Sequence, residues 1–404
     1  MKNLILFLGL SILFFSCNNK KEKNHLEEQL IRIPLSCAKD QVLNLSEFAD
    51  SIDVIPLETK DECLIGWIPR IIATDDRYYI SSAIGYKHRK LLVFDKQGRF
   101  IRQIGKEGQG PKEYIELKDF SVFNDSIIKI TEVYNMISYD KDGNFIRKVK
   151  QKETPLAMLS LKGKTFVPTF RPTLCNDKLL AVLDSEDKFV SHQITVSSVA
   201  AKVADYYVMD AGFTNDENNI YYTYPFSHIV YKLDVETLEN VPYFYLDYGK
   251  REASWSIFEE NDDNQTWTEK QQRNNEYMKI NEILNVGNKF VFNSVDDEVL
   301  CYFAIYSKKT GKILSGQKIK DDMFFKGNLV KLRNHMTPHN CEGEYLLWAI
   351  QPEILLNGYH AYRKALGETK WKLFRQKFPR LVEVCEQLDE DSNPVLLKIK
   401  LKEF

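Results

Sequence analysis

Residues 91–102 read LLVFDKQGRFIR, and residues 136–147 repeat this pattern as MISYDKDGNFIR, 45 residues further along the chain. Each copy contains an apolar run, an aspartate, a turn with a glycine and a second apolar run. The aspartate can cap the turn, and the glycine supplies the positive φ that a tight hairpin requires. The repeat therefore predicts antiparallel β-hairpins at a regular spacing.

Further apolar runs continue the pattern, some of them followed by a turn signal. They are Leu179–Asp184, Ile229–Asp234, Tyr302–Tyr306 and Glu344–Ile350. A β-repeat of about 45 residues is the period of a four-stranded propeller blade. One twisted sheet cannot bury both of its faces, whereas blades stacked around an axis bury each other's. We therefore expect an all-β propeller of four-stranded antiparallel blades; the alternative is a pair of β-sandwiches with coincidental spacing.

Two segments depart from the repeat, and a final strand follows them. Residues 255–279 are polar and charged, which predicts a partly helical insertion. Residues 361–388 predict a short C-terminal helical segment, because apolar residues recur at helical spacing and Pro379 can begin a second helix. A closing strand is expected over 395–401. We expect it to complete a blade with an N-terminal strand near Gln41–Leu45, which would tie the two chain ends together.

The N-terminus has the parts of a secretion signal: Lys2, an apolar run from Leu4 to Phe15, and a small residue before Cys17. The apolar run is too short to span a membrane, which takes about 20 residues. We expect residues 1–16 to be a signal peptide and Cys17 to carry a lipid, as in a lipobox. Residues 17–30 would be a flexible tether and 31–404 the propeller. The alternative is an ordinary signal peptide with an incidental cysteine.

Composition narrows the classes of partner. The chain is 44% hydrophobic and 28% charged, which is typical of a globular protein. Its net charge of −2 gives no basic field, so no nucleic-acid partner is expected. The seven cysteines include no zinc spacing, and most are expected to be buried. We expect a monomeric domain without a cofactor.

The string IGKEGQGPKEY (residues 104–114), directly after the first hairpin, resembles the six-bladed β-propeller lipoproteins of Gram-negative envelopes, which are relatives of NHL-type propellers. Supporting echoes are IPLET (residues 55–59) and DSNPVL (residues 391–396). The resemblance implies six blades and a place in the cell envelope. The family has no settled activity, so no catalytic residue can be transferred.

Several motifs favour structural roles. Gly105, Gly108 and Gly110 lack the Gly-Lys-Ser/Thr ending of a phosphate loop, so they predict a turn between blades. His335, His339 and Cys341 could bind zinc, but Pro338 favours a loop, and no metal site is expected. His335 is instead assigned to the rim of a binding pocket. Acidic runs at 261–264 and 296–298 lack the spacing of a calcium loop. No Gly-x-Ser-x-Gly elbow is present.

The geometry of a propeller suggests where a ligand would bind. Equivalent loops of every blade emerge on one face, so the loops between the second and third runs should converge there. The residues in or beside these loops are Tyr86, His88, Tyr134, Asn135, Arg171, Tyr224, Phe226, His228 and Asp296. Aromatic and polar groups in a shared hollow suit a sugar or a peptide. The alternative is that they are exposed turn residues without a ligand.

These observations predict a lipid-anchored outer-membrane module that binds a glycan, a peptide or a protein, or that serves as a scaffold. The leaflet face remains open between periplasm and cell surface. The alternative function is a lyase or hydrolase with its site in the central funnel. Converging acids with shifted pKa values would favour the enzyme. An apolar patch on one rim would favour a protein partner, and an aromatic cup would favour a glycan or a peptide.

Overall fold

The computed structural model describes residues 30–35, 41–84, 88–132, 134–152, 155–207, 212–224, 226–251, 269, 279–295, 301–326, 330–331 and 340–404. Some of the sequence predictions lie outside these residues. They are the signal peptide, Cys17 with nearly all of its tether, Tyr86, Asp296, His335 and most of the 255–279 insertion.

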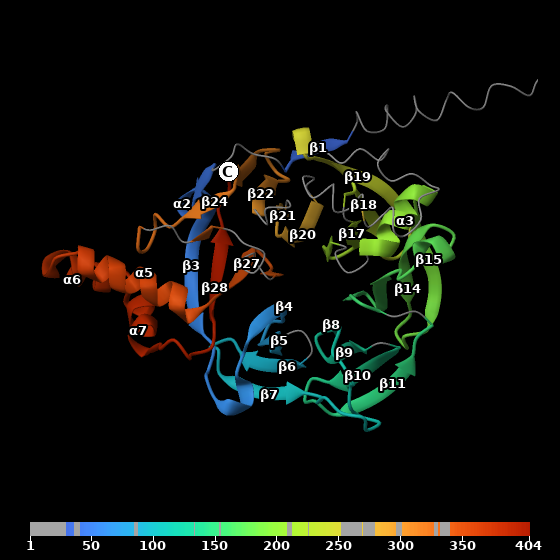
Figure 1. Ribbon diagram of the computed structural model, residues 1–404, viewed down its shortest axis with the longest axis horizontal. Coiled ribbons are helices and arrows are strands. Elements are labelled where there is room, and N and C mark those ends of the chain that lie inside the picture. Colours follow the sequence, from blue (N-terminus) through green and yellow to red (C-terminus); the bar gives the residue numbers. More distant parts are fainter. Residues whose placement is uncertain are drawn as a thin grey trace, which may run out of the picture.

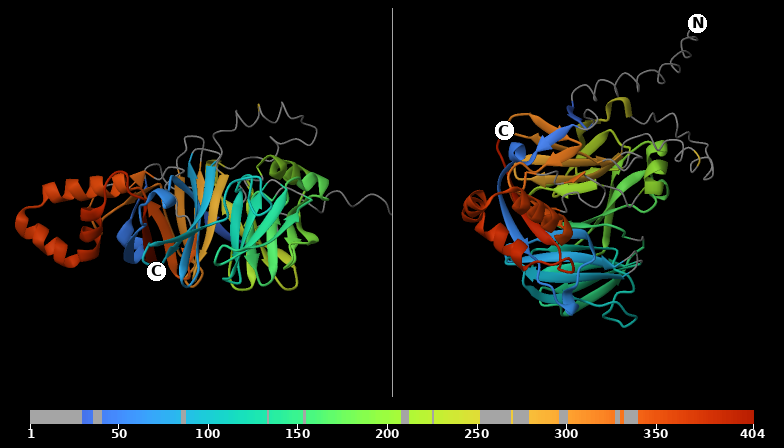
Figure 2. Two further views of the ribbon diagram at one scale, coloured as in Figure 1. Left: turned by 90° about the horizontal axis from the view of Figure 1, so that it is seen from below. Right: turned by 60° about the vertical axis from the view of Figure 1, so that its left-hand side comes forward.

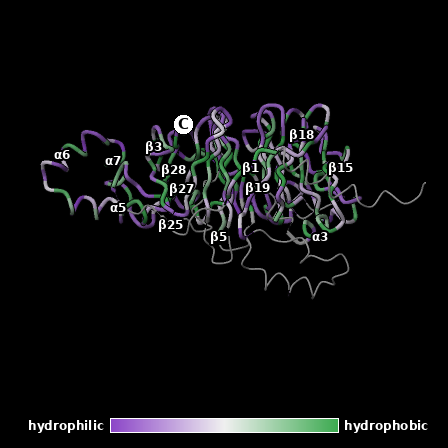
Figure 3. Tube along the Cα trace, turned by 90° about the horizontal axis from the view of Figure 1, so that it is seen from above, coloured by the Kyte–Doolittle hydropathy of each residue, from purple (hydrophilic) through white to green (hydrophobic). Residues whose placement is uncertain are grey.

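The chain forms six twisted antiparallel sheets arranged around a central axis, which confirms the six-bladed β-propeller (Figure 1). Five blades have four strands, and blade 4 gains a fifth from the N-terminal segment. The first strand of each blade lies nearest the axis, since these inner strands contact those of other blades. Figure 3 shows hydrophobic residues concentrated in the strands and hydrophilic residues at the turns.

The strands follow one another in chain order from the axis outward in blades 1 to 5. Blade 1 contains β4 (Trp67–Ala73), β5 (Arg77–Ile84), β6 (His88–Asp95) and β7 (Phe100–Ile104). Blade 2 contains β8 (Asp119–Phe123), β9 (Ile127–Glu132), β10 (Asn135–Asp140) and β11 (Phe145–Lys150). Blade 3 contains β12 (Leu159–Leu161), β13 (Lys164–Pro168), β14 (Lys178–Leu183) and β15 (Phe189–Thr195). Blade 4 contains β16 (Gly212–Asn215), β17 (Asn219–Thr223), β18 (Ile229–Asp234) and β19 (Asn240–Asp247). Blade 5 contains β20 (Lys279–Val286), β21 (Lys289–Val295), β22 (Cys301–Ser307) and β23 (Ile313–Gly316).

Blade 6 combines both ends of the chain. It contains β26 (Asn340–Glu342), β27 (Tyr345–Ile350), β28 (Val395–Leu401) and, as its outer strand, β3 (Ala49–Pro56). The strand expected near Gln41–Leu45 does not pair with β28. Its residues form β2 (Val42–Asn44), which lies parallel to β24 (Lys318–Lys320) in a small sheet with β25 (Val330–Lys331), and then the short helix α2 (Leu45–Phe48). The chain therefore closes the ring one strand later than the sequence pattern suggested.

The repeated hairpin owes its shape to the aspartate and glycine that the sequence singled out. The Asp95 carboxylate accepts hydrogen bonds from the backbone N–H groups of Gln97 and Arg99, both at 2.9 Å. Gly98 has φ of 82°. Asp140 and Gly143 repeat this geometry in blade 2.

Blade 3 uses the same turn with one change. Asp184 accepts the corresponding backbone bonds from Glu186 and Lys188, but Asp187 stands where the other turns have glycine, with φ of 67°. Aspartate tolerates this conformation better than most residues with a side chain. Unlike glycine, it carries a carboxylate, and the side chain of Asp187 is completely buried. The turn of blade 3 therefore lacks the glycine that the first two hairpins share.

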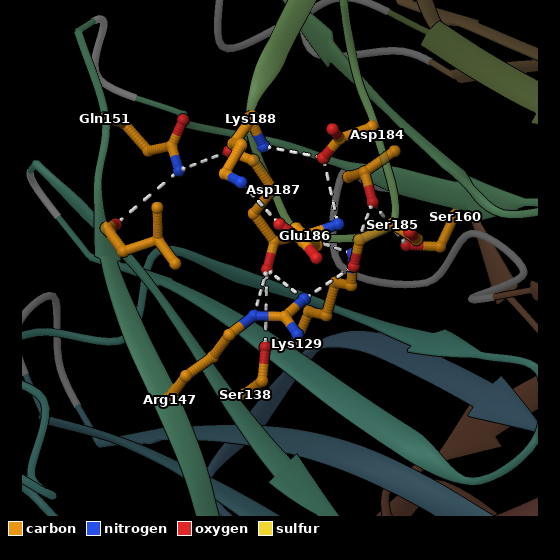
Figure 4. Close-up of polar contacts among 12 residues, drawn as sticks. Lys129, Ser138, Arg147, Gln151, Ser160, Asp184, Ser185, Glu186, Asp187 and Lys188 are labelled. Atoms are coloured by element: carbon orange, nitrogen blue, oxygen red, sulfur yellow. Dashed lines mark hydrogen bonds and ion pairs between the residues drawn. The ribbon is translucent and has the colours of Figure 1, made fainter.

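The Asp187 carboxylate sits between two cations from blade 2 (Figure 4). Lys129 Nζ donates to Asp187 Oδ1 and, at 3.0 Å, to Thr165 Oγ1. Arg147 donates to Asp187 Oδ2 through Nε at 3.2 Å and Nη2 at 2.8 Å. Lys129 is also fully buried, and this burial lowers its pKa while the Asp187 carboxylate opposes the shift.

The other seams between blades are mainly apolar. Buried clusters join blades 6 and 1, 1 and 2, 3 and 4, 4 and 5, and 5 and 6, around residues such as Leu92, Ile130, Val182, Phe290 and Trp348. Between blades 2 and 3 the buried apolar cluster contains only Met136, Met158, Val167 and Leu183, the smallest in the described part of the chain. The ion pair of Lys129 and Asp187 fills the space next to it.

Helices lie outside the ring. The C-terminal segment contains α5 (Pro352–Ala365), α6 (Glu368–Lys377) and α7 (Pro379–Gln387), which project beside blade 6 in Figures 1 and 2. The helical segment was expected to begin at residue 361, but Pro352 starts it directly after β27, at the first helical position that suits proline. A further helix, α3 (Ser198–Tyr207), follows blade 3. Among the described helices, none has both the length and the apolar character needed to cross a membrane.

Replacing Ile399, which is fully buried in β28, with alanine should destabilise the protein by about 2–5 kcal/mol, because a cavity would open beside the closing pair of strands. Lys400→Ala is the matched control, since this neighbour is half-buried and should change stability by no more than about 0.5 kcal/mol. Urea unfolding followed by tryptophan fluorescence measures both. Equal midpoints for the two variants would contradict a closing role for β28.

Asp187→Asn keeps a residue that tolerates positive φ but removes the charge that faces Lys129 and Arg147. We expect a loss of about 3–5 kcal/mol, because a buried cation loses its partner. The double variant Lys129→Met/Asp187→Asn should recover much of this loss, as no lysine charge is then buried. Urea unfolding of the wild type, Lys129→Met, Asp187→Asn and the double variant gives the coupling energy. Additive effects in the double variant would show that the two side chains do not stabilise one another.

Candidate ligand site in the central channel

The inner strands enclose a cavity of about 480 Å³ on the axis of the propeller. β4, β8, β12, β16, β20 and β26 all contribute side chains, so residues far apart in the sequence meet there. The inner strands are the part of each blade that lies nearest the axis, so their inward-pointing side chains line the channel. This volume lies within the range of about 300–1,000 Å³ that is usual for small-molecule sites.

Arg70 and Asp119 join three blades on one wall of the channel. Arg70 Nη1 lies 2.6 Å from Asp119 Oδ2 and also donates to the backbone oxygen of Met158 at 2.8 Å. The Met158 backbone N–H donates to the same Asp119 oxygen at 2.7 Å. The Arg70 side chain keeps 23% of its surface exposed, so its remaining N–H groups can reach a ligand in the cavity.

Arg89 lies at one mouth of the channel. Its Nη1 donates to the backbone oxygen of Lys118 at 2.7 Å, and its guanidinium lies 5.8 Å from the centroid of the Trp67 ring. The Arg89 Nε–H is buried without a hydrogen-bond partner in the described part of the chain. Such a group costs about 1–3 kcal/mol when it stays unsatisfied, so Arg89 is held in a costly arrangement.

Glu282 provides an acid on blade 5. Asn293 Nδ2 lies 3.2 Å from Glu282 Oε2. Burial raises the pKa of the Glu282 carboxyl to about 8, although Asn293 and the positive charge of Arg70 oppose this shift. The carboxyl is therefore largely protonated at neutral pH and can donate a hydrogen bond into the channel.

Two amides on the inner strands β20 and β26 bond to neighbouring blades. Asn340 on β26 donates through Nδ2 to the backbone oxygen of Ile71 in blade 1. Asn285 on β20 donates through Nδ2 to the backbone oxygen of Asn215 at 3.0 Å, and its backbone N–H donates to Thr214 Oγ1 at 3.1 Å. These bonds link neighbouring blades at the axis and hold the channel wall in place.

The described thiols and acids offer no metal centre. Cys341 Sγ donates to the backbone oxygen of Asn285 at 3.1 Å, and burial raises its pKa to about 12, which keeps it a thiol. Within the described ranges, no three histidine, cysteine, aspartate or glutamate side chains come together as metal ligands. His335, one of the ligands considered from sequence, lies outside those ranges.

The antiparallel topology places the loops between second and third strands of blades 1 to 4 on one face, which we call the loop face. His88, Tyr134 and Arg171 lie at this face. The Tyr134 side chain is 58% exposed, and His88 Nδ1 lies 3.1 Å from Glu107 Oε2. The start of β4 and the end of β5 also reach this face, where Trp67 and Ile84 remain 39% and 57% exposed.

Two other residues that the sequence placed in these loops are buried. Tyr224 is 5% exposed and belongs to the apolar cluster between blades 3 and 4. His228 is 8% exposed and stacks on Tyr245 with ring centroids 5.5 Å apart. Among the sequence-predicted residues that are described, none lines the central cavity. Their binding of a ligand stays a prediction.

The sequence prediction relied on loops, so it missed Arg70, Asp119 and Glu282, which lie on inner strands, and also Arg89, which directly follows His88 on β6. The sequence does contain a signal for two of these residues. Arg70 and Glu282 interrupt apolar strand segments, WIPRIIA and KINEILNV, where an uncharged residue would be expected on a buried face. A charge inside the first strand of a blade points to the axis of the ring.

Comparison with known proteins places the chain in a family and supports the fold. Residues 30–400 match the family described as a domain of unknown function (DUF4934), so the chain belongs to that family. A protein from Bacteroides fragilis NCTC 9343, described as exported, has 18% sequence identity and a TM-score of 0.67, with 93% of this chain and 100% of that chain covered. At this identity the likeness shows the fold alone.

Weaker structural likenesses extend to other proteins. BamB from Moraxella catarrhalis shares 12% identity at a TM-score of 0.40, covering 74% of this chain and 86% of that chain. The extracellular domain of a one-component system from B. thetaiotaomicron shares 10% identity at a TM-score of 0.38, covering 76% of this chain and 38% of that chain. No curated protein matches the sequence.

The raised pKa of Glu282 predicts a pH dependence of stability. The folded protein binds a proton at Glu282 up to about pH 8, whereas the unfolded chain releases it near the ordinary value of 4.5. The contribution of this group to stability therefore falls as pH rises from about 4.5 to 8 and is constant above. Glu282→Gln removes this dependence, so the variant should gain stability relative to the wild type across that interval. Thermal midpoints measured from pH 4 to 9 check it, and a constant difference would contradict the raised pKa.

Proposed function

We propose that this protein is a ligand-binding module of the cell envelope whose ligand enters the central channel at the loop face. The observation that carries the proposal is the cluster of Arg70, Arg89, Asp119 and Glu282 around a cavity of about 480 Å³. The channel is strongly polar, with Phe213 as its one described aromatic lining residue. This favours a small polar ligand inside the channel over an apolar one.

The arrangement fits an acidic sugar best. Arg89 and Arg70 each use Nη1 on a neighbouring blade and retain further N–H groups, which can pair with a carboxylate. The exposed ring of Trp67 beside Arg89 offers a flat apolar face for a sugar ring. Hydroxyl groups deeper in the channel would meet Thr214, Asn215 and the protonated Glu282 carboxyl. A peptide with an acidic group is the competing ligand.

The proposed location rests on the N-terminal sequence. A basic start, an apolar run and Cys17 are typical of an exported lipoprotein. The structurally similar protein from B. fragilis is also described as exported. Lipid on Cys17 would tether the propeller to the outer membrane through residues 17–30, on the periplasmic face or at the cell surface.

Titration calorimetry with glucuronic acid, and with glucose as the uncharged comparison, tests the channel. We expect glucuronic acid to bind more tightly than glucose, and Arg89→Met to weaken glucuronic acid at least about tenfold, because a charge-assisted hydrogen bond is lost. Arg99→Met is the matched control. It removes the same charge from blade 1, but its exposed side chain lies in the turn on the opposite face.

The outcome against the proposal is equally concrete. Unchanged binding in Arg89→Met would place the ligand away from the channel. The double variant His88→Ala/Tyr134→Ala then tests the loops that the sequence favoured, since both side chains are exposed and their loss should not disturb the fold. Binding of an acidic tripeptide but not of glucuronic acid, both measured on the wild type, would assign the channel to peptides.

Glu282 supports a second candidate function, which is a lyase or hydrolase with its site in the funnel. A carboxyl that is protonated at neutral pH can act as a general acid. Incubation with a uronic-acid oligosaccharide, followed for new reducing ends and for absorbance of an unsaturated product, separates the two. Turnover that disappears in Glu282→Gln would favour the enzyme, and intact oligosaccharide with measurable binding would favour the binding module.

A further inference from the structure

A second cavity opens at the outer part of the seam between blades 2 and 3. Its volume is about 340 Å³, which is within the range of small-molecule sites. It lies between β11 of blade 2 and β13, β14 and β15 of blade 3. None of its lining residues belongs to the central channel, so the two sites are separate.

The walls of this cavity, which we call the seam pocket, are largely apolar. The apolar lining residues are Val149, Pro155, Val167, Ala181, Leu183 and Phe189. Val167, Ala181 and Leu183 are nearly buried, at 5–6% exposure, whereas Phe189 stays 47% exposed at the rim. An apolar wall that reaches the surface in this way can take up an aliphatic chain, which gains by leaving water.

The pocket exists because this seam is not filled with apolar side chains. The other described seams bury larger hydrophobic clusters, whereas this one has four apolar residues and the ion pair of Lys129 with Asp187. Asp187 also contributes to the pocket lining, and Gln151 Nε2 donates to its backbone oxygen at 3.1 Å (Figure 4). A charged pair inside the seam keeps the two blades from packing together further out.

The charges around the seam pocket are predominantly positive. Lys150, Lys152 and Lys188 line it, and Asp187 is the one acidic lining residue that is described. Lys129 and Arg147 already meet the charge of Asp187, and Lys188 pairs with Glu186. Lys150 and Lys152 are exposed and make no ion pair within the described residues, so they can hold an anionic group at the mouth.

We propose that the seam pocket binds a fatty acid, with the aliphatic chain between Val149, Ala181 and Leu183 and the carboxylate facing Lys150 and Lys152. The chemistry of the pocket favours this ligand because its apolar walls end at two lysines that form no ion pair with any residue the structure describes. No covalent step is involved. The proposal does not rest on the channel ligand, since the two sites share no residue.

Calorimetry with octanoate, decanoate and decanol on the full chain tests the site. Decanoate should bind more tightly than octanoate, by about fourfold for each added methylene that the pocket buries. Decanol, which has the same chain without the charge, should bind at least about fivefold more weakly than decanoate. Equal affinities of decanoate and decanol, or no binding of decanoate, would overturn the proposal.

Two kinds of variant locate the binding. Lys150→Gln/Lys152→Gln should lower decanoate affinity toward that of decanol. The matched control is Lys370→Gln/Lys372→Gln, which removes the same charge from exposed lysines on α6. Ala181→Leu should fill the pocket and abolish decanoate binding. Phe189→Ser serves the same purpose at an exposed rim position and keeps the test valid where Ala181→Leu fails to fold.

Each result bears on the site. Decanoate affinity that survives all three pocket variants would overturn the proposal, as would equal losses in the α6 control. Binding of an acidic peptide with a leucine side chain, in place of decanoate, would assign the seam pocket to a protein partner and overturn the fatty acid. Glucuronic acid binding should be unchanged in the pocket variants, which separates this site from the channel.

Discussion

The pairing of β28 with β3 is the constraint on which the rest of the molecule depends. It runs from Val395 opposite Pro56 to Leu401 opposite Ala49, so the last strand of the chain completes its blade with one of the first. This pairing closes the ring, so neither end of the row of blades leaves an apolar face in water. The closed ring also fixes the distances across the axis, so residues such as Arg70 and Glu282 can line one channel.

Within the closed ring, the seams between blades differ in what they bury. Five described seams bury large apolar clusters, and burial of apolar surface is the main favourable term in folding. The seam between blades 2 and 3 buries a smaller apolar cluster and contains the ion pair of Lys129 and Asp187 beside it. An ion pair of this kind recovers its desolvation cost only with good geometry and further hydrogen bonds, which Thr165 and Arg147 supply. The seam pocket opens at the rim beside this ion pair.

Much of the fold could be predicted from the sequence, because the hairpin signal is local. Asp95 with Gly98 and Asp140 with Gly143 dictate their turns through bonds within five residues. The partner of β28 could not be predicted in this way, since strand pairing across the whole chain depends on register rather than on local pattern. The segment Gln41–Leu45 has a strand before it, β1 (Ile31–Pro34), and another after it, β3 (Ala49–Pro56), and the local sequence does not say which of the three pairs with β28. Likewise, Tyr224 and His228 carry the composition of a binding loop. The apolar cluster between blades 3 and 4 buries Tyr224, and His228 packs against Tyr245 and Tyr248 of its own blade.

The candidate site was harder to predict than the fold for a related physical reason. A loop can be recognised in the sequence by its glycines and polar residues. An inner strand differs from other strands only by a charged residue within an apolar segment. Arg70 and Asp119 illustrate the point. Replacing such an ion pair with apolar residues of similar volume is often neutral or stabilising, so stability alone does not account for it. The seams of the same protein show that apolar packing between blades is available. The charges of Arg70 and Asp119 on the axis are therefore in keeping with the proposal that the channel binds a polar ligand.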